Sequence, residues 1–228
     1  MFTNNYKVFK RIIFIITIAL MLASGGGHED CVKLLLKHNC EVDIIDNTNN
    51  SALSYACERG HTNITQMLLD AGSNKDIITS DLKTPLILAS NANQYEIVNI
   101  LLQSKVNVNA IDSNLNSALH YACLNGNISL AVLLLKNGAT LKLTNTVGKT
   151  CIDMALYNHH LYMSYFLTEE GEMIYPNYIK DMNWNRRKNF VLFLKGCYNP
   201  NNNAIVTNNP TDCVFRDEFI RRLIAKFL

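Results

Sequence analysis

The sequence repeats with a period of 33 residues. The segment SALHYACLNGNISLAVLLLKNGA begins at Ser117 and contains two apolar stretches separated at Gly126, and Ser51 opens a similar segment, SALSYACERGHTNITQMLLDAGS. Weaker copies begin at Thr84 and Thr150. A fixed period of this size indicates a stack of small units that pack mainly on their neighbours. The period therefore constrains the fold more strongly than composition does.

Aligned on this period, the units share small and apolar positions. One column holds only alanine, another leucine or isoleucine, and a third, in the second apolar stretch, only leucine: Ala23, Ala56, Ala89, Ala122 and Ala155; Leu20, Leu53, Leu86, Leu119 and Ile152; Leu35, Leu68, Leu101, Leu134 and Leu167. A methyl group is what fits where one helix packs closely against the next. The columns predict two helices in each unit, with the alanines buried between neighbouring first helices.

Helix-opening and turn residues follow the same period. The first helices are expected to open at Ile18, Ser51, Thr84, Ser117 and Thr150, and hydroxyl side chains in four of these suit helix N-caps. The turn between the helices falls at Gly27, Gly60, Asn93 and Gly126, which tolerate a positive φ. His159 departs from that column and predicts a distorted fifth unit. The second helices are expected to end near Asn39, Gly72, Gly138 and Gly171, and Lys105 breaks this pattern.

These motifs resemble the ankyrin repeat. Thr84 to Ile87 reads Thr-Pro-Leu-Ile and Ser117 to His120 reads Ser-Ala-Leu-His, close to the family's Thr-Pro-Leu-His, and Gly-His pairs begin at Gly27 and Gly60. The resemblance covers roughly residues 18–172. It implies an all-α solenoid of stacked helix-turn-helix units, each preceded by a β-turn hairpin, here called the finger.

Charge and composition divide the chain into three expected parts. Residues 1–17 are an apolar N-terminal segment carrying +3, residues 18–172 form the array with nine basic and fifteen acidic residues, and residues 173–228 form a tail carrying +5. The tail is predicted to hold helices over Asn185–Lys195 and from Thr211 to Leu228, joined by a linker over Tyr198–Pro210. The mildly acidic array argues against nucleic acid as a partner.

The N-terminal segment has two interpretations. Basic residues precede the apolar run from Ile12 to Ala23, and small residues follow, which is the layout of a secretory signal. The run is shorter than the 17–25 residues, roughly, of a membrane-spanning helix. Because Leu20, Ala23 and Gly27 keep the repeat spacing, the segment is also explained as the start of a degenerate first repeat. Contact of Ile12 to Ala23 with a membrane or a partner stays open.

The seven cysteines are odd in number and include no C-x-x-C pair. Cys31, Cys57 and Cys123 fall in columns expected to be small and buried. This pattern favours free thiols in a reducing compartment over a disulfide framework. We therefore expect a cytoplasmic protein, or a secreted or membrane-anchored one if residues 1–23 act as a signal.

The sequence offers no clear site for catalysis, cofactors or metal. Gly148-Lys149-Thr150 lacks the earlier glycine of a phosphate-binding loop, because Leu143 stands in its place. The spacings of His28, Cys31, His38 and Cys40 match no zinc pattern. We expect a protein that is not an enzyme and needs no cofactor.

The expected function is to present a concave surface to a protein partner, with the chain acting as a monomer. In repeats resembling these, contacts come from the finger and the end of the first helix. Carried over, the expected partner-binding residues are Asn47, Thr48, Asn50, Tyr55, Glu58, Arg59, Ser80, Asp81, Lys83, Asn91, Ala92, Ser113, Asn114, Asn116, Tyr121, Leu124 and Asn125. The two tyrosines are explained equally well as packing between first helices.

A second hypothesis assigns the tail an effector role. The final helix is amphipathic, as at the end of some protist and large-DNA-virus ankyrin proteins, where a truncated F-box-like tail in poxviral members recruits ubiquitin-ligase machinery. The chain would then be a substrate-recruiting adaptor of a ubiquitin ligase. The simpler interpretation is that the tail helices cap the array.

Overall fold

The computed structural model describes residues 15–16, 18–160, 163–164 and 167, and the strand backbone at 198–199 and 204–205. The chain divides into two compact units, Met1–Met163 and Ser164–Leu228. In the first unit, helical residues 15–16 and 18–26 precede α2 (Glu29–Lys37), and the following helices come in pairs. These are α3 (Ala52–Arg59) and α4 (Thr62–Asp70), α5 (Pro85–Asn91) and α6 (Tyr95–Gln103), α7 (Ala118–Leu124) and α8 (Ile128–Lys136), followed by α9 (Cys151–Tyr157).

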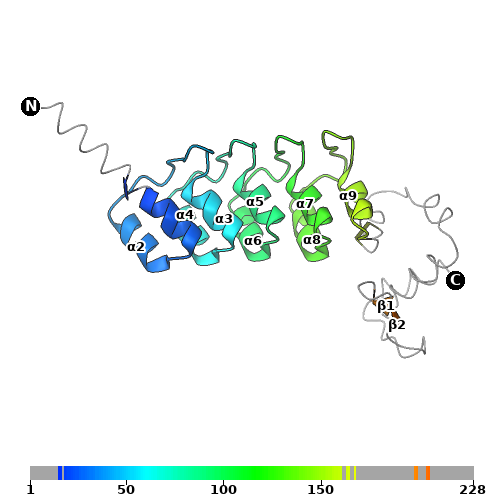
Figure 1. Ribbon diagram of the computed structural model, residues 1–228, viewed down its shortest axis with the longest axis horizontal. Coiled ribbons are helices and arrows are strands. Elements are labelled where there is room, and N and C mark those ends of the chain that lie inside the picture. Colours follow the sequence, from blue (N-terminus) through cyan, green and yellow to red (C-terminus); the bar gives the residue numbers. More distant parts are fainter. Residues whose placement is uncertain are drawn as a thin grey trace, which may run out of the picture. The chain divides into compact units, whose positions relative to one another are not determined.

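The helices form two rows that can be followed in Figure 1. In the first row α3 contacts α5, α5 contacts α7, and α7 contacts α9; in the second, α2, α4, α6 and α8 follow one another. The two helices of each pair also contact each other. Helices of seven to nine residues are marginal alone in water, so this packing is what stabilises them. The fold is the all-helical repeat solenoid that the 33-residue period predicts.

The predicted alanine column is buried within the first row of helices. Ala56, Ala89, Ala122 and Ala155 have no exposed surface, and Ala23 is 6% exposed. The leucine columns are buried except at the two ends, where Leu35 and Ile152 are half-buried. An interior repeat covers both faces of its neighbour, whereas a terminal one leaves a face uncovered.

The predicted N-caps are formed in four units. The Ser51, Thr84 and Thr150 hydroxyls accept hydrogen bonds from the backbone N–H three residues on, and Ser117 forms a capping box with His120. The prediction at Ile18 was wrong, because residues 15–16 are already helical. Ile18 has no side-chain acceptor to cap a helix, and the flanking apolar residues extend one.

Three positions of the repeat take a left-handed backbone conformation: the turn between the two helices, the end of the second helix and the tip of the finger. Gly27, Gly60, Asn93 and Gly126 do so between the helices, as predicted. His159, from which a distorted fifth unit was predicted, takes the left-handed conformation of its column at a φ of 62°, so this turn is not distorted. Lys105, which breaks the residue pattern of the column at the second-helix ends, takes the same conformation as Asn39, Gly72 and Gly138, at a φ of 58°. The stacked neighbours therefore fix the turn, and the non-glycine residue bears the strain. A third such column, at the finger tips, was not predicted: Asn49, Leu82, Leu115 and Gly148.

Other expectations are corrected or fall outside the described residues. Cys31 is exposed, because α2 turns it away from the core, whereas Cys57 and Cys123 are buried.

The linker expected over Tyr198–Pro210 contains β1 (Tyr198–Asn199) and β2 (Ala204–Ile205), which pair antiparallel. The helices expected over Asn185–Lys195 and Thr211–Leu228 lie outside the described residues, as does most of the fifth unit's second helix. Within the described residues, no helix has both the length and the apolarity needed to span a membrane.

Candidate interaction surface

The fingers are short hairpins that precede α3, α5, α7 and α9, and we number them 2 to 5 after their repeat. Each is closed by a backbone hydrogen bond between its first and fifth residues: Asp46 and Asn50, Thr79 and Lys83, Asp112 and Asn116, Asn145 and Lys149, at 2.9–3.1 Å from N to O. The tips project from one side of the array (Figure 1). The first and fifth residues of each finger therefore fix where the three tip residues stand.

The first finger residue also braces its hairpin through its side chain. Oδ1 of Asp112 accepts from the backbone N–H groups of Asn114 and Asn116, at 2.9 and 2.8 Å, and Asp46 and Asn145 act in the same way. Asp and Asn favour such local turns because their short side chains reach the backbone two residues on. Each brace holds the backbone of its finger in one conformation.

Neighbouring fingers are joined by backbone hydrogen bonds. The Ser80 N–H donates to the Thr48 carbonyl, Ser113 to Asp81, and Thr146 to Asn114, each at 2.9 Å. All three donors lie 33 residues apart. The exposed tips of fingers 2 to 5 are therefore joined into a continuous chain rather than four independent loops.

Two tyrosines of the first helices hold the finger carboxylates. The Tyr55 hydroxyl donates to Oδ2 of Asp46 at 2.6 Å, and the Tyr121 hydroxyl to Oδ2 of Asp112 at 2.5 Å. Although partial burial opposes it, the bonds from Tyr55, Thr48 and the backbone lower the pKa of Asp46 to about 2. Burial, followed by the bond to Asp112, raises the pKa of Tyr121. Both tyrosines thus connect a helix to a finger, a role that neither sequence interpretation included.

The other predicted residues divide by exposure and by what their side chains contact. Asn47, Thr48, Glu58, Arg59, Ser80, Asp81, Asn91, Ser113, Asn114 and Asn125 are exposed, whereas Asn50, Tyr55, Lys83, Ala92, Asn116 and Leu124 are half-buried. Tyr121 is 9% exposed. The Asn125 amide donates to the Asn91 carbonyl of the preceding repeat at 3.0 Å. The Lys83 ammonium lies 5.9 Å from the centre of the Tyr121 ring. Asn125, like the tyrosines, therefore serves the array itself.

Comparison with known proteins decides the family. A family model described as ankyrin repeats in three copies matches residues 4–79, 20–112 and 86–178, well over half of the chain. The chain belongs to the ankyrin-repeat family. Ankyrin repeats are in general protein–protein interaction modules and are typically not catalytic. No curated protein matches the chain.

The ankyrin face also carries an apolar column that the sequence analysis missed. Ile45, Ile78 and Ile111 immediately precede fingers 2, 3 and 4 and are 43%, 45% and 40% exposed. Exposed isoleucines are unusual enough in a repeated position to indicate a contact surface. Their 33-residue spacing was visible in the sequence, but an isoleucine beside a predicted core reads first as a core residue.

A pocket lies at the N-terminal end of this ankyrin face. It has a volume of about 510 Å³ and is lined by Ile18, Met21, Leu22, Gly25 and Gly26 from the first helix. The facing residues are Ile45, Asp46, Asn47, Tyr55 and Arg59. The described residues of the first repeat continue as helix where a finger would stand. The first helix therefore faces finger 2 directly.

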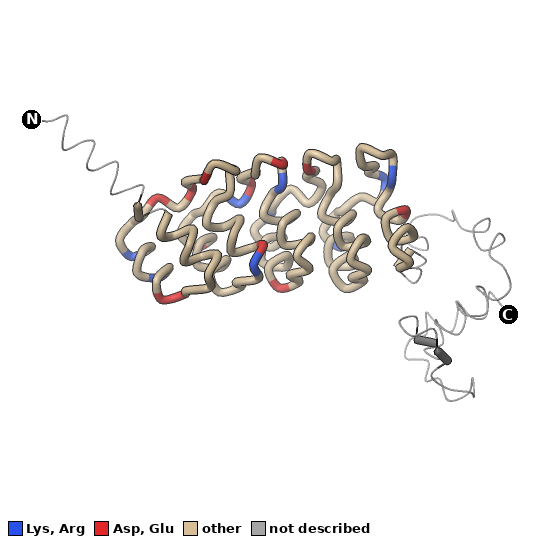
Figure 2. The backbone as a smooth tube through the Cα atoms, in the orientation of Figure 1, with Lys and Arg blue, Asp and Glu red and all other residues tan. Residues whose placement is uncertain are grey.

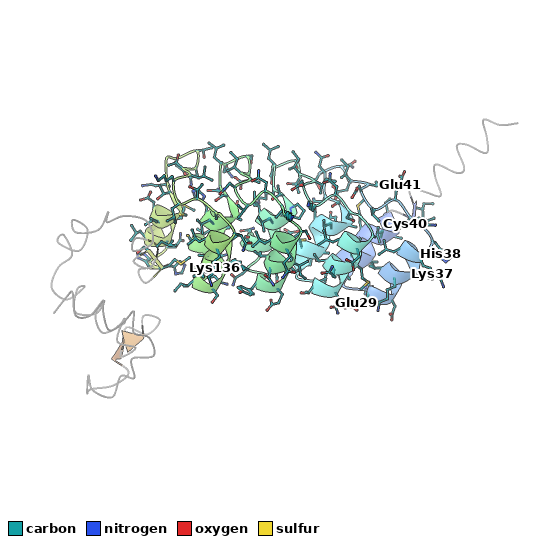
Figure 3. All side chains as sticks on the ribbon, turned by 180° about the vertical axis from the view of Figure 1, so that it is seen from behind. Glu29, Lys37, His38, Cys40, Glu41 and Lys136 are labelled. Atoms are coloured by element: carbon teal, nitrogen blue, oxygen red, sulfur yellow. The ribbon has the colours of Figure 1, made fainter. Side chains whose placement is uncertain are left out.

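The charges of the ankyrin array are sparse and of both signs on the fingers (Figure 2). The histidines and cysteines near α2, at positions 28, 31, 38 and 40, form no metal site within the described residues. His38 and Cys40 lie just after the end of α2 (Figure 3), and no group of three metal-ligating side chains occurs in the part of the chain that the structure describes. Gly148 and Thr150 serve as a finger tip and an N-cap. Both features are explained by the repeat.

Proposed function

We propose that this ankyrin array is a non-catalytic binding module that presents fingers 2 to 5 and the adjoining ends of α3, α5 and α7 to a protein partner. The proposal includes the exposed predicted residues and adds Ile45, Ile78 and Ile111. Tyr55, Tyr121 and Asn125 contribute by holding that surface in place.

The observation that carries the proposal is the combination of exposure with rigidity. The finger backbones are hydrogen-bonded within and between repeats, so few conformations are lost on binding. Exposed isoleucines precede three of the fingers, Arg59 ends α3 and Lys83 lies in finger 3, so this surface can bury apolar area and orient a partner through charge. The second row of helices offers no such repeated apolar column among the described residues.

Site-specific photo-crosslinking tests this proposal. A photoreactive side chain at Ser80 or Ser113 should capture a discrete partner from the native source, whereas the same group at Gln103, on the second row, should not. Lys83→Glu should then weaken the purified complex by about tenfold, as expected for a charge at a binding surface. Equal capture from both rows, or none from the fingers, would refute the proposal.

The adaptor hypothesis remains a narrower version of the same function. Its support is the amphipathic pattern of Phe219, Ile220, Leu223 and Ile224, which lies outside the described residues. Removing Thr211 to Leu228 distinguishes the two roles. A capping tail lowers the melting temperature when removed, whereas a recruiting tail leaves melting unchanged and abolishes binding to ligase components.

The same proposal includes a cellular compartment, which concerns the cysteine thiols. Burial raises the pKa of Cys57 to about 12 and also raises that of Cys123, so both thiols are unreactive within the core. We propose a reducing, cytoplasmic location, in which the described cysteines stay free thiols as they are here, and a chain acting as a monomer. Thiol titration of protein from its native source, before and after unfolding, measures how many cysteines are reduced.

A further inference from the structure

The pocket at the N-terminal end of the array combines apolar walls with a cation that has no ion-pair partner among the described residues. Leu22, Ile45 and Met21 line it, and Leu22 is 70% exposed. Arg59 also lines it, and its guanidinium forms no hydrogen bond or ion pair with any described residue. A volume of about 510 Å³ is ample for one large side chain and its neighbours.

The two charges that line the pocket differ in availability. Asp46 is already satisfied, because its carboxylate accepts from the Tyr55 hydroxyl, the Thr48 hydroxyl and two backbone N–H groups. Arg59 has no such partners among the described residues, and the neighbouring Glu58 is not among the lining residues. The charged group with hydrogen-bonding capacity left for a ligand is therefore the guanidinium, which binds carboxylates in a bidentate manner.

The room for a ligand comes from two helical glycines. Gly25 and Gly26 occupy the positions that hold Glu58 and Arg59 in the next repeat. A Cβ at Gly25 would lie 3.5 Å from the Tyr55 Cβ, an ordinary contact, and no positive φ requires glycine there. Glycine within a helix is destabilising relative to alanine. Neither backbone conformation nor steric conflict explains Gly25, whereas an open pocket does.

We propose that this pocket binds a segment of a protein partner in which a bulky apolar side chain adjoins a carboxylate. The apolar side chain enters between the first helix and finger 2, and the carboxylate pairs with Arg59. This rests on the proposed function, of which it specifies the partner's chemistry at one end of the face. The array as a whole is acidic, which repels an acidic peptide elsewhere and makes binding here selective.

Chemical-shift titration of the full-length ¹⁵N-labelled chain tests the proposal without knowing the partner. The probe is acetyl-Ser-Leu-Glu-Ser-amide, with Leu-Lys and Ser-Glu versions for comparison. We expect saturable shifts at Leu22, Gly25, Tyr55 and Arg59 with a Kd on the order of 1 mM. The comparison peptides should bind at least about fivefold more weakly, which corresponds to the loss of one apolar or charged contact.

Two variants in the pocket, each paired with a control variant on the second row, distinguish binding in the pocket from general effects of the substitution. Gly25→Leu should weaken binding of the probe peptide by about tenfold or more, because the leucine fills the pocket. It should not lower the melting temperature, because it also removes a glycine from a helix. Gln103→Leu, which adds the same side chain to the second row, should not alter binding. Arg59→Glu should abolish the preference for Leu-Glu over Leu-Lys, whereas Lys136→Glu, on α8 (Figure 3), should not.

Several results would overturn the proposal. Absent or scattered shifts, or a Gly25→Leu variant that binds equally well, would exclude this ligand. Pocket shifts that depend on protein concentration without peptide would identify a second copy as the occupant, and contacts from residues 1–14 that the probe cannot displace would identify the chain's own N-terminus. If fingers 3 and 4 still crosslink a partner in those cases, the proposed function stands and only the pocket inference fails.

Discussion

The tyrosine hydroxyls provide the sharpest energetic test, because two repeats hold the same contact at different burial. Tyr121→Phe and Tyr55→Phe each remove one oxygen and leave the ring in place. The Tyr121 hydroxyl is the donor to Oδ2 of Asp112, a residue 1% exposed, whereas Asp46 is half-buried. The same chemical change is therefore made in a dry site and in a wet one.

The expected magnitudes follow from what replaces the lost donor. In the Tyr121→Phe protein, Oδ2 of Asp112 loses its donor among the described residues, and little water can reach it. A buried charged acceptor left unpaired costs about 2–3 kcal/mol. At Asp46 water can take the place of the Tyr55 hydroxyl, so the cost should be about 0.5–1 kcal/mol. For a domain of this size, the first value corresponds to a melting temperature roughly 4–12 °C lower.

Urea denaturation of both variants, followed by circular dichroism, measures the difference. Native-like spectra and unchanged denaturant slopes would establish that the fold is retained. The expected result is a loss at least about twice as large for Tyr121→Phe as for Tyr55→Phe, because burial is the main difference between the two sites. Equal losses, or a larger one at Tyr55, would refute the role given to the Tyr121–Asp112 bond.

Four further perturbations have expected outcomes that denaturation can measure. Leu68→Ala should cost about 2–5 kcal/mol because it empties a fully buried site, whereas Asn114→Ala at an exposed finger tip should cost under about 0.5 kcal/mol; similar losses would contradict the assigned repeat alignment. Lys105→Gly should stabilise the protein by about 1 kcal/mol, because glycine takes the left-handed conformation without strain, and a loss would mean that the lysine side chain has a stabilising contact. Ser90→Ala should be neutral or stabilising by up to about 1 kcal/mol, since the buried Ser90 hydroxyl has no hydrogen-bond partner in the described part of the chain, and a large loss would reveal one. Burial lowers the pKa of His120 below its ordinary 6.5, so the unfolded state binds more protons and stability should fall as pH drops below about 6.5, an effect that His120→Gln should reduce.

The architecture was predictable because close packing limits side-chain size at fixed positions. Ala56, Ala89 and Ala122 identify the contacts of the first row directly, and the hydroxyls of Ser51 and Thr84 identify helix starts. These are local requirements, and each restricts one position of the repeat to one or two residue types. The same restriction recurs in every unit, which is why one sequence was enough to predict the architecture.

The proposed binding face was predictable only in part, because its properties depend on neighbouring repeats. The left-handed conformations of Lys105 and His159 are set by the stack and not by residue preference. The exposure of Ile78 follows from the path of the finger, which its side chain does not reveal. The pocket lies where finger 2 faces the first helix, and glycines stand on that helix at Gly25 and Gly26. None of these features corresponds to a motif.

Amide hydrogen exchange at the finger tips tests the stacked arrangement most directly. The Ser80, Ser113 and Thr146 amides each donate to the preceding finger, whereas the equivalent Asn47 amide has no acceptor among the described residues. Because these residues are exposed, only the bonds between repeats can protect them. We expect the three to exchange at least about tenfold more slowly than Asn47. Four amides exchanging at one rate, as in an unstructured loop, would contradict the account.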